Sequence, residues 1–221
     1  FVDTNKEGFS DRILEQSIID GYDRFLSKDS LFSSLGELDG FRILCAHNLG
    51  PWGTLSVNSL CEKLLQNRAD SDIKGKFFKR IIMVRLNDYN KGLFNGDTGV
   101  VFPEASRKQA VEDRGQTVGF KAADKGVRTC RYADLPGHET AFAVTIHKSQ
   151  GSEFEQVLII IPDQLTPVVT RQLLYTGVTR ARKKVTILGA MAVIEGAMAI
   201  SPEQTTRIGR HLKGLLDRKP V

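Results

Sequence analysis

The sequence predicts an α/β fold in which a parallel sheet flanked by helices carries a small antiparallel insertion. Two apolar, β-prone runs, at 141–146 and 157–161, enclose a short polar stretch that contains Gly151. This pattern indicates a buried strand, a tight loop and a second buried strand. A third apolar run, at 41–46, leads through a glycine-bearing loop into a helical pattern. From about 76 to 136 the apolar residues alternate instead, which predicts short antiparallel strands.

The composition is that of an ordinary globular protein, with 41% hydrophobic and 26% charged residues among 221. A net charge of +5 and a pI near 9.1 mildly favour anionic partners. Cys45, Cys61 and Cys130 form no C-x-x-C pair, which argues for reduced thiols in a cytoplasmic protein and against a zinc site. We assign no metal site. No run reaches transmembrane length, so we expect no membrane partner. The chain lacks an initiator Met, and we expect it to be part of a longer protein.

The N-terminal third predicts two helices around one strand. Ser10 and Asp11 can cap a helix that runs to about residue 26, with its apolar residues on one side. The stretch 30–40 is polar and glycine-bearing, so we expect a connection. After the strand at 41–46, Thr54 is expected to cap a helix that reaches about residue 66. Trp52, in the loop between them, can serve as a packing anchor.

The polar loop at 145–153 carries the chemistry most suited to a ligand. Thr145, His147, Lys148 and Ser149 supply hydrogen-bond donors, and Gly151 lets the backbone approach a phosphate closely. In a parallel sheet such a loop is expected at the carboxyl edge, where ligands bind. The alternative is an ordinary solvated loop with a lone Lys.

A second cationic segment follows. The run 164–194 contains no Asp or Glu and five cations, namely Arg171, Arg180, Arg182, Lys183 and Lys184. Pro167 suits the first turn of a helix to about residue 178, and 185–188 predicts another buried strand. Arg180 and Arg182 therefore lie where helix gives way to strand, and guanidinium groups suit phosphate oxygens.

The alternating region adds a possible nucleic-acid surface. Asn95-Gly96 between apolar runs predicts a hairpin turn, and the short strands at this spacing predict a small barrel. Lys and Arg are frequent there, and Tyr89 lies in a polar turn beside Asn87, where its ring could stack on bases. We expect Phe94 in the barrel core.

Several of these runs resemble superfamily-one helicases. TIHKSQGSEF at 145–154 resembles motif V, and LYTGVTRAR at 174–182 resembles motif VI. The runs PVVTRQLLY at 167–175, NDY at 87–89 and GLFNGD at 92–97 are similar to RecD, the alpha subunit of exodeoxyribonuclease V. The strand, loop and helix that begin at 41 resemble the RecD version of motif IV, with Asn58 on the helix. This resemblance implies that the loop or the helix lies near a nucleotide, and the alternative is the packing role of Trp52.

The resemblance implies a fold. It places a RecA-like second motor domain in two parts, 1–75 and 139–221, around an SH3-like barrel inserted at 76–138. After motif VI we expect a small-residue helix at 190–200 and a basic C-terminal helix from Pro202 to about residue 216.

The resemblance also implies roles for individual residues. Arg180 would be an arginine finger that reaches the γ-phosphate of ATP. Glu153 would meet the nucleotide ribose, Gly151 would shape its loop, and Arg182 would support Arg180 or contact phosphate. Contacts to single-stranded DNA would come from Thr145, His147 and Ser149, with Asn87 and Tyr89 from the insertion.

A complete motor needs parts that this sequence does not supply. No G-x-x-x-x-G-K-[ST] run occurs, and Asp163 follows Pro162 without a second acid, so we expect it to cap a strand. ATP and Mg²⁺ would bind with an N-terminal RecA-like domain of the same protein. The parent would be a 5′-3′ DNA helicase that acts with RecB/RecC-type subunits or alone, and the fragment itself should not hydrolyse ATP.

Two other classes remain open. One is a module that binds single-stranded DNA or docks onto partner subunits without energy transduction. The other is a metabolic enzyme that handles phosphate, which fits the Lys-Ser-Gln-Gly loop but leaves the barrel and the motif VI resemblance unexplained.

Overall fold

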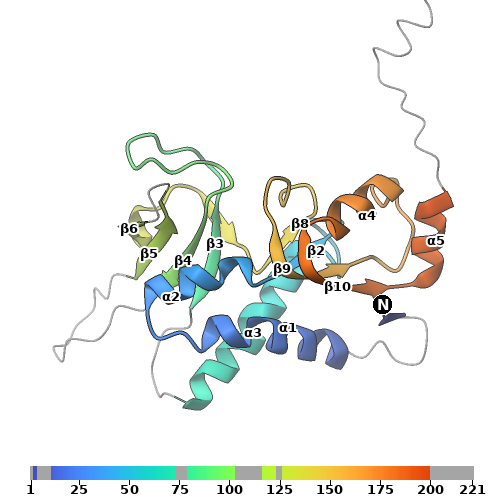
Figure 1. The fold of residues 1–221 in the computed structure, drawn as a ribbon, viewed down its shortest axis with the longest axis horizontal. Helices are drawn as coiled ribbons and strands as arrows, with labels where there is room; N and C mark the ends of the chain where they lie inside the picture. Colours follow the sequence, from blue (N-terminus) through green and yellow to red (C-terminus); the bar gives the residue numbers. More distant parts are fainter. Residues whose placement is uncertain (1, 4–10, 73–78, 103–115, 123–125, 200–221) are drawn as a thin grey trace, which may run out of the picture.

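Two five-stranded sheets, one parallel and one antiparallel, lie side by side in the computed structural model (Figure 1). The structure describes residues 2–3, 11–72, 79–102, 116–122 and 126–199. The helix expected from Pro202 to about residue 216 lies outside these residues. The α/β class with a parallel sheet and an antiparallel addition is confirmed.

The parallel sheet has the strand order β1-β10-β9-β2-β8. Its strands are β1 (Val2–Asp3), β2 (Phe41–Cys45), β8 (Ala143–Thr145), β9 (Phe154–Ile160) and β10 (Ala181–Gly189). The three predicted strands around 41–46, 141–146 and 157–161 are all present, as is the strand predicted at 185–188. The sequence patterns did not predict β1, which pairs with β10 through Val2 and Leu188.

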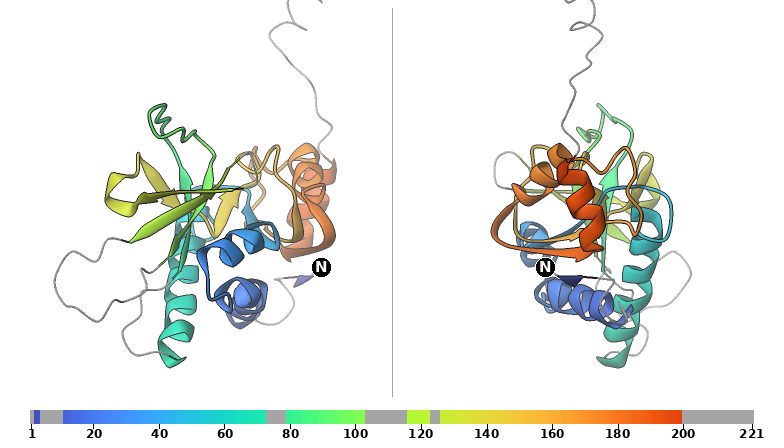
Figure 2. Two further views of the ribbon diagram at one scale, coloured as in Figure 1. Left: turned by 60° about the vertical axis from the view of Figure 1, so that its left-hand side comes forward. Right: turned by 90° about the vertical axis from the view of Figure 1, so that its right-hand side faces the viewer.

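Helices cover both faces of this sheet. Helices α1 (Asp11–Leu26) and α3 (Thr54–Asp72) pack together on one face, and α4 (Arg171–Val178) and α5 (Met191–Ala199) lie on the other (Figure 2). The first turn of α4 differs from the prediction. Thr170, not Pro167, begins the helix, because its hydroxyl accepts a hydrogen bond from the Leu173 N–H at 3.2 Å.

Helix α1 is held to the sheet by aromatic side chains. The ring of Tyr22 packs edge-to-face on Phe41 and Phe142, with centroid separations of 4.9 and 5.1 Å. Its hydroxyl donates to the Phe142 carbonyl oxygen, so the one polar atom of this buried ring has a partner. Gly21 permits the close approach, because a Cβ atom there would lie 2.3 Å from the Phe41 ring.

The segment 30–40 is not the plain connection that the sequence predicts. It forms α2 (Leu31–Gly36) and a short 3₁₀ helix, η1 (Glu37–Asp39). Ser30 and Ser33 form a reciprocal capping box, in which each side chain bonds the other's backbone. Helix α2 then packs on the antiparallel sheet, where Leu31 occupies the space over Gly119.

The antiparallel sheet has the strand order β6-β5-β4-β3-β7. Its strands are β3 (Arg80–Val84), β4 (Thr98–Phe102), β5 (Thr117–Lys121), β6 (Val127–Arg131) and β7 (His138–Thr140), with the 3₁₀ helix η2 (Tyr132–Asp134) after β6. Within the described residues no strand pairing joins β6 to β7, so closure into a barrel remains a prediction.

Both faces of the antiparallel sheet are apolar. Ile81 and Met83 on one face belong to the same core as the parallel sheet, whereas Ile82 and Val84 on the other face belong to a separate small core. This alternation is what the period of a strand requires. Because one face joins the main core, the two sheets pack directly against each other.

The β3–β4 connection is longer than the predicted hairpin turn. Residues 85–97 form a loop with its own antiparallel bridge between Asp88 and Leu93. Asn95-Gly96 does form a turn, with Gly96 at φ +98° and its N–H bonded to the Val84 carbonyl at 2.9 Å. The Asn-Gly pair therefore closes the base of the loop.

Lys79 fastens the start of β3 to the end of α1. Its ammonium donates to the carbonyls of Phe25 at 3.1 Å, Leu26 at 2.8 Å and Lys28. These carbonyls lie at the C-terminal end of a helix, where they lack helical partners and attract cations. Burial lowers the pKa of Lys79 to about 8.

Asn58 of α3 completes the hydrogen bonding of the edge strand β8. Its side-chain amide donates to the carbonyls of Thr140 and Ala143, at 3.0 and 2.9 Å, and its side-chain oxygen accepts from the Ala143 N–H at 2.8 Å. The carboxamide thus stands in for a neighbouring strand in a buried position.

We predict that Asn58→Ala lowers the free energy of unfolding by about 2 kcal/mol or more, because buried backbone groups lose their partners. Urea unfolding measures the change. Ser59→Ala, on the exposed side of the same helix, should shift it by less than about 0.5 kcal/mol. Equal effects of the two substitutions would contradict the role of Asn58.

Candidate functional site

The loop 146–153 leads from the carboxyl edge of the parallel sheet to its amino edge. Thr145, at the end of β8, is level with Cys45, and Cys45 is level with Ile160 at the end of β9. The loop must nevertheless deliver the chain to Phe154, at the beginning of β9. The seven residues of β9 span roughly 20 Å, so the two ends of the loop lie at opposite edges of the sheet.

Arg180 contacts the far end of this loop. Its Nη1 donates to the Ser152 carbonyl at 3.1 Å and its Nε to the Thr176 carbonyl at 3.2 Å. The Phe154 N–H donates to the Arg180 carbonyl at 2.8 Å, which ties the start of β9 to the start of β10. The predicted approach of Arg180 to the loop is therefore found.

The edge at which they meet differs from the prediction. The sequence pattern suggested the carboxyl edge, but Arg180 lies at the amino ends of β9 and β10. The physical reason is the crossover: α4 carries the chain back to the beginning of the next parallel strand, so residues after its end lie at the amino edge.

Arg182 and Glu153 form an exposed ion pair at the same edge. Arg182 Nε lies 3.0 Å from Glu153 Oε2. No acid lies near Arg182 in sequence, yet the loop supplies one in space. Gly151, two residues earlier, adopts φ +86°, a left-handed conformation that favours glycine. A Cβ atom there would meet nothing within 4 Å, so the backbone of this bend is open to a ligand.

The other DNA-facing candidates separate into exposed and buried residues. His147 is exposed at the carboxyl edge, and the partly exposed Thr145 accepts a hydrogen bond from the Lys148 N–H at 3.3 Å. Ser149 is buried, and its hydroxyl donates to the Ile146 carbonyl at 2.7 Å. In this structure Ser149 therefore shapes the loop from inside and offers its hydroxyl to the backbone.

Two loops that follow β2 and β9 meet at the carboxyl edge. His47 Nε2 is hydrogen-bonded to Thr166 Oγ1 at 2.9 Å, and Trp52 Nε1 donates to Asp163 at 2.6 Å. Asp163 thus accepts an indole N–H from another loop, where the sequence pattern suggested a strand cap. Thr54 starts α3, and its hydroxyl is bonded to the Asn48 side chain.

The 85–97 loop presents two aromatic rings to solvent. Tyr89 is 77% exposed and Phe94 is 47% exposed, and their ring centroids lie 6.0 Å apart at an interplanar angle of 76°. Phe94 is thus outside the core in which we expected it. Asn87 holds the loop, because its side chain accepts from the Asn95 N–H at 2.8 Å and donates to the Tyr89 hydroxyl at 3.3 Å.

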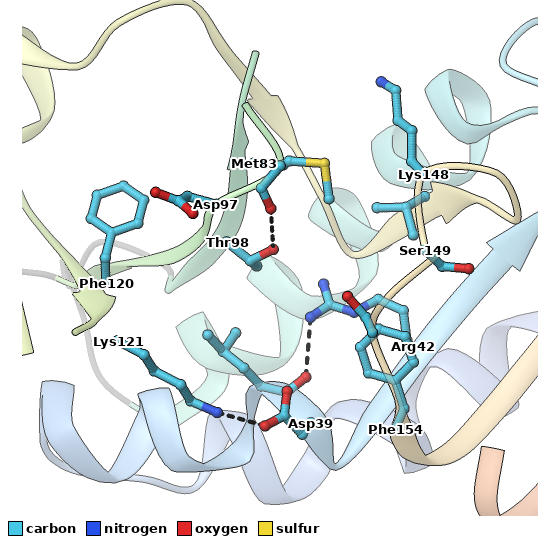
Figure 3. Close-up of a pocket in the computed structure, with 14 residues that line it drawn as sticks. Asp39, Arg42, Met83, Asp97, Thr98, Phe120, Lys121, Lys148, Ser149 and Phe154 are labelled. Carbon is cyan, nitrogen blue, oxygen red and sulfur yellow. Dashed lines mark hydrogen bonds and ion pairs between the residues drawn. The ribbon is translucent and has the colours of Figure 1, made fainter. Parts of the chain in front are cut away.

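A cavity of about 250 Å³ lies between the two sheets, beside the 146–153 loop (Figure 3). Arg42 lines it and is buried, and its Nε has no hydrogen-bond partner in the structure. Its guanidinium lies 5.0 Å from the centroid of the Phe154 ring and donates to the carbonyls of Leu38 and Ala141. Burial lowers the pKa of Arg42. A charged residue within an apolar strand pattern is the sequence signal that could have identified it.

The residues fit one part of the expected ligand. The guanidinium groups of Arg180, which is partly exposed, and Arg182, which is exposed, suit an anion such as a phosphate at the amino edge. Within the described ranges no cluster of three His, Cys, Asp or Glu side chains could hold a metal ion. In the same residues no helix is long and apolar enough to cross a membrane.

Comparisons with known proteins agree with the motifs. Residues 140–188 match the model of the UvrD-like helicase C-terminal domain. The chain is 35% identical over 182 residues to the RecBCD enzyme subunit RecD of Mycolicibacterium smegmatis. This match covers 81% of this chain and 30% of that protein. It is 31% identical over 113 residues to the ATP-dependent RecD2 DNA helicase of Deinococcus radiodurans, covering 51% of this chain and 14% of that protein.

A solved structure of Pif1 helicase from Bacteroides in complex with ADP-AlF3 and ssDNA superposes with a TM-score of 0.44 and 18% identity. The match covers 92% of this chain and 53% of that one. The chain spans less than a third of the length of these curated relatives. From the motifs and the RecD similarity over most of its length, the chain belongs to the RecD-like superfamily-one helicases and corresponds to their C-terminal part.

Proposed function

We propose that this chain is the second motor domain of an ATP-dependent 5′-3′ DNA helicase, a RecD-like alpha subunit of exodeoxyribonuclease V. One observation carries the proposal: a single loop, 146–153, connects the edge that bears Arg180 to the edge that bears His147. A motor needs such a link, because a change at a nucleotide must be transmitted to a DNA strand.

Arg180 is the proposed arginine finger. Its hydrogen bonds go to the carbonyls of Ser152 and Thr176 and to the Thr179 hydroxyl, which are all neutral, and no carboxylate pairs with it among the described residues. It is partly exposed, at the end of a short helix, where rotation of the side chain would bring the guanidinium to a phosphate outside the chain. There it would stabilise the charge that develops on the transferred phosphoryl group.

The remaining residues of the amino edge would position the nucleotide. Glu153 is exposed and would accept hydrogen bonds from the ribose, while Gly151 gives the bend its left-handed conformation. The ion pair of Arg182 with Glu153 would hold that carboxylate in place. When bound, ATP with Mg²⁺ supplies the phosphoryl group, and its metal ligands would come from an N-terminal RecA-like domain of the same protein.

Single-stranded DNA would cross the molecule on the side of the two exposed loops. Figure 1 shows the loop 85–97 and the loop 146–153 rising from neighbouring sheets. Thr145 and His147 would contact the sugar-phosphate backbone, which fixes position without reading sequence. Tyr89 would stack on a base, and Asn87 would hold the loop that carries it.

The similarity to RecD also suggests an identity for the antiparallel sheet and a cellular role for the protein. We infer that the antiparallel sheet is an SH3-like barrel inserted in the motor domain, supported by its five strands and two apolar faces. We propose a role in double-strand break repair, with RecB/RecC-type subunits in the cytoplasm, and the RecD similarity supports this proposal.

We predict that Arg180→Ala in the intact helicase lowers DNA-stimulated ATP turnover by about 10³-fold or more, as loss of an arginine finger does. Nucleotide affinity should change by less than about threefold, because the finger acts mainly in the transition state. Steady-state ATPase assays and nucleotide-binding titrations measure the two effects. Arg171→Ala, on the exposed start of the same helix, is the matched control and should leave turnover near wild type. Unchanged turnover in Arg180→Ala would remove it from this role.

We also predict that Tyr89→Ala weakens binding of a labelled oligothymidylate by roughly five- to a hundredfold, since one base stack is worth about 1–3 kcal/mol. The salt dependence should stay the same, because no charge is removed. Fluorescence anisotropy measures both. Tyr175→Ala removes an equally exposed ring from α4 and serves as the control. Equal affinities for the two variants would exclude Tyr89 from the DNA surface.

A further inference from the structure

Two cations from different sheets share one carboxylate at the junction between the sheets. Lys148, in the loop 146–153, places its Nζ 2.5 Å from Glu139 Oε1. Arg85, directly after β3, places its Nε 3.6 Å from Glu139 Oε2. Glu139 lies on β7, which pairs with β3 through Met83. The two oxygens of one anionic group therefore face two cationic side chains.

The cations are more accessible than the anion between them. The side chain of Arg85 is 63% exposed and that of Lys148 is 40% exposed, whereas that of Glu139 is 24% exposed. Figure 3 shows Lys148 directed away from the cavity that its loop lines. An approaching anion would thus meet the Lys and Arg before the carboxylate.

Breaking the ion pairs of Glu139 with Lys148 and Arg85 costs little free energy. Exposed ion pairs contribute only about 0–1 kcal/mol, because water screens them. Arg85 approaches Glu139 most closely with Nε, at 3.6 Å, which is longer than a strong hydrogen bond. Its terminal nitrogens are therefore available for the two-point contact that a guanidinium makes with phosphate.

From this geometry we infer that Lys148 and Arg85 form a binding site for one backbone phosphate of single-stranded DNA, and that Glu139 occupies the site when DNA is absent. Its carboxylate mimics the phosphate in charge and in its paired oxygens. When the strand binds, the two cations exchange the carboxylate for the phosphate. Glu139 thereby weakens DNA binding and keeps the cations in place between encounters.

The position of the site supports this inference, which rests on the proposed function. Lys148 follows His147, and Arg85 precedes Asn87 and Tyr89 by a few residues in the other loop. The site therefore lies between the proposed backbone contacts of one sheet and the proposed base stack of the other. A strand that reaches both loops must pass the cation pair.

The test measures binding of a fluorescein-labelled oligothymidylate to the full chain by anisotropy, from about 50 to 200 mM salt. Glu139→Gln should tighten binding by about two- to fivefold, because the competing carboxylate is lost. Lys148→Ala and Arg85→Ala should each weaken binding and each reduce the salt slope by about 0.7, the value for one phosphate contact on a single strand. Lys148→Ala should cost more affinity in the Glu139→Gln background than alone.

Glu155→Gln is the matched control. The Glu155 carboxylate also forms ion pairs with two cations, Lys183 at 2.8 Å and Arg24 at 3.3 Å. Glu155 lies on β9 of the parallel sheet, whereas Glu139 lies on β7 of the antiparallel sheet. Glu155→Gln removes the same charge as Glu139→Gln, so its effect on DNA affinity measures the general electrostatic contribution of one carboxylate.

The outcomes separate the two proposals. If Glu139→Gln and Glu155→Gln bind DNA equally, or if Lys148→Ala and Arg85→Ala keep the wild-type salt slope, the phosphate site is excluded while DNA binding by the chain stands. If the wild-type chain does not bind the oligonucleotide, the DNA surface itself is wrong and this inference falls with it. The arginine-finger assay is independent of either result.

Discussion

The arrangement of this molecule depends on one topological constraint. Strands β8 and β9 are parallel, both neighbour β2, and no helix connects them. The chain between them must therefore return from one edge of the sheet to the other within eight residues, 146–153. Parallel strands usually need a helix for this return. Here the return is made by a polar loop, and so one short covalent segment carries residues for two separate surfaces.

A buried cation supports the end of that loop that leads into β9. Arg42 pairs with no carboxylate in the part of the chain that the structure describes, yet it lies in the core beside the start of β9. Burying a guanidinium is costly, and here two carbonyl oxygens and the face of Phe154 offset the cost. The same Phe154 donates its N–H to Arg180. A buried side chain thus supports the start of β9, to which the Arg180 backbone is hydrogen-bonded.

Sequence reasoning succeeded where the pattern was local. The apolar runs located β2, β8, β9 and β10, and the amphipathic run located α1, because burial on one side leaves a clear period. It failed for α2, whose capping box uses Ser33 in place of the usual Glu or Gln. It also failed for Phe94, since alternation indicates a strand but not which loops extend beyond the sheet.

The candidate site residues could be chosen from their chemistry in the sequence, but their arrangement in space could not. The motifs identified Arg180, Glu153 and Gly151, and the structure brings Arg180 to the predicted loop. Their edge could not be read from sequence, because it depends on β8, β9 and β10 all running parallel, and a loop without a helix gives no sign of such a return. The contacts of Trp52 with Asp163, and of Glu139 with Lys148, join residues far apart or in different sheets, so no local pattern predicts them.

Lys79 has a mechanical consequence for the antiparallel sheet. Its ammonium ties the first residue before β3 to the last turn of α1, and at the other end β7 continues into β8 through the buried residues Ala141 and Phe142. Both attachments oppose rotation of the antiparallel sheet relative to the parallel sheet. The antiparallel sheet and its loop 85–97 would then move with the parallel sheet as one rigid unit. A small rotation of the parallel sheet would displace the tip of that loop by a larger distance.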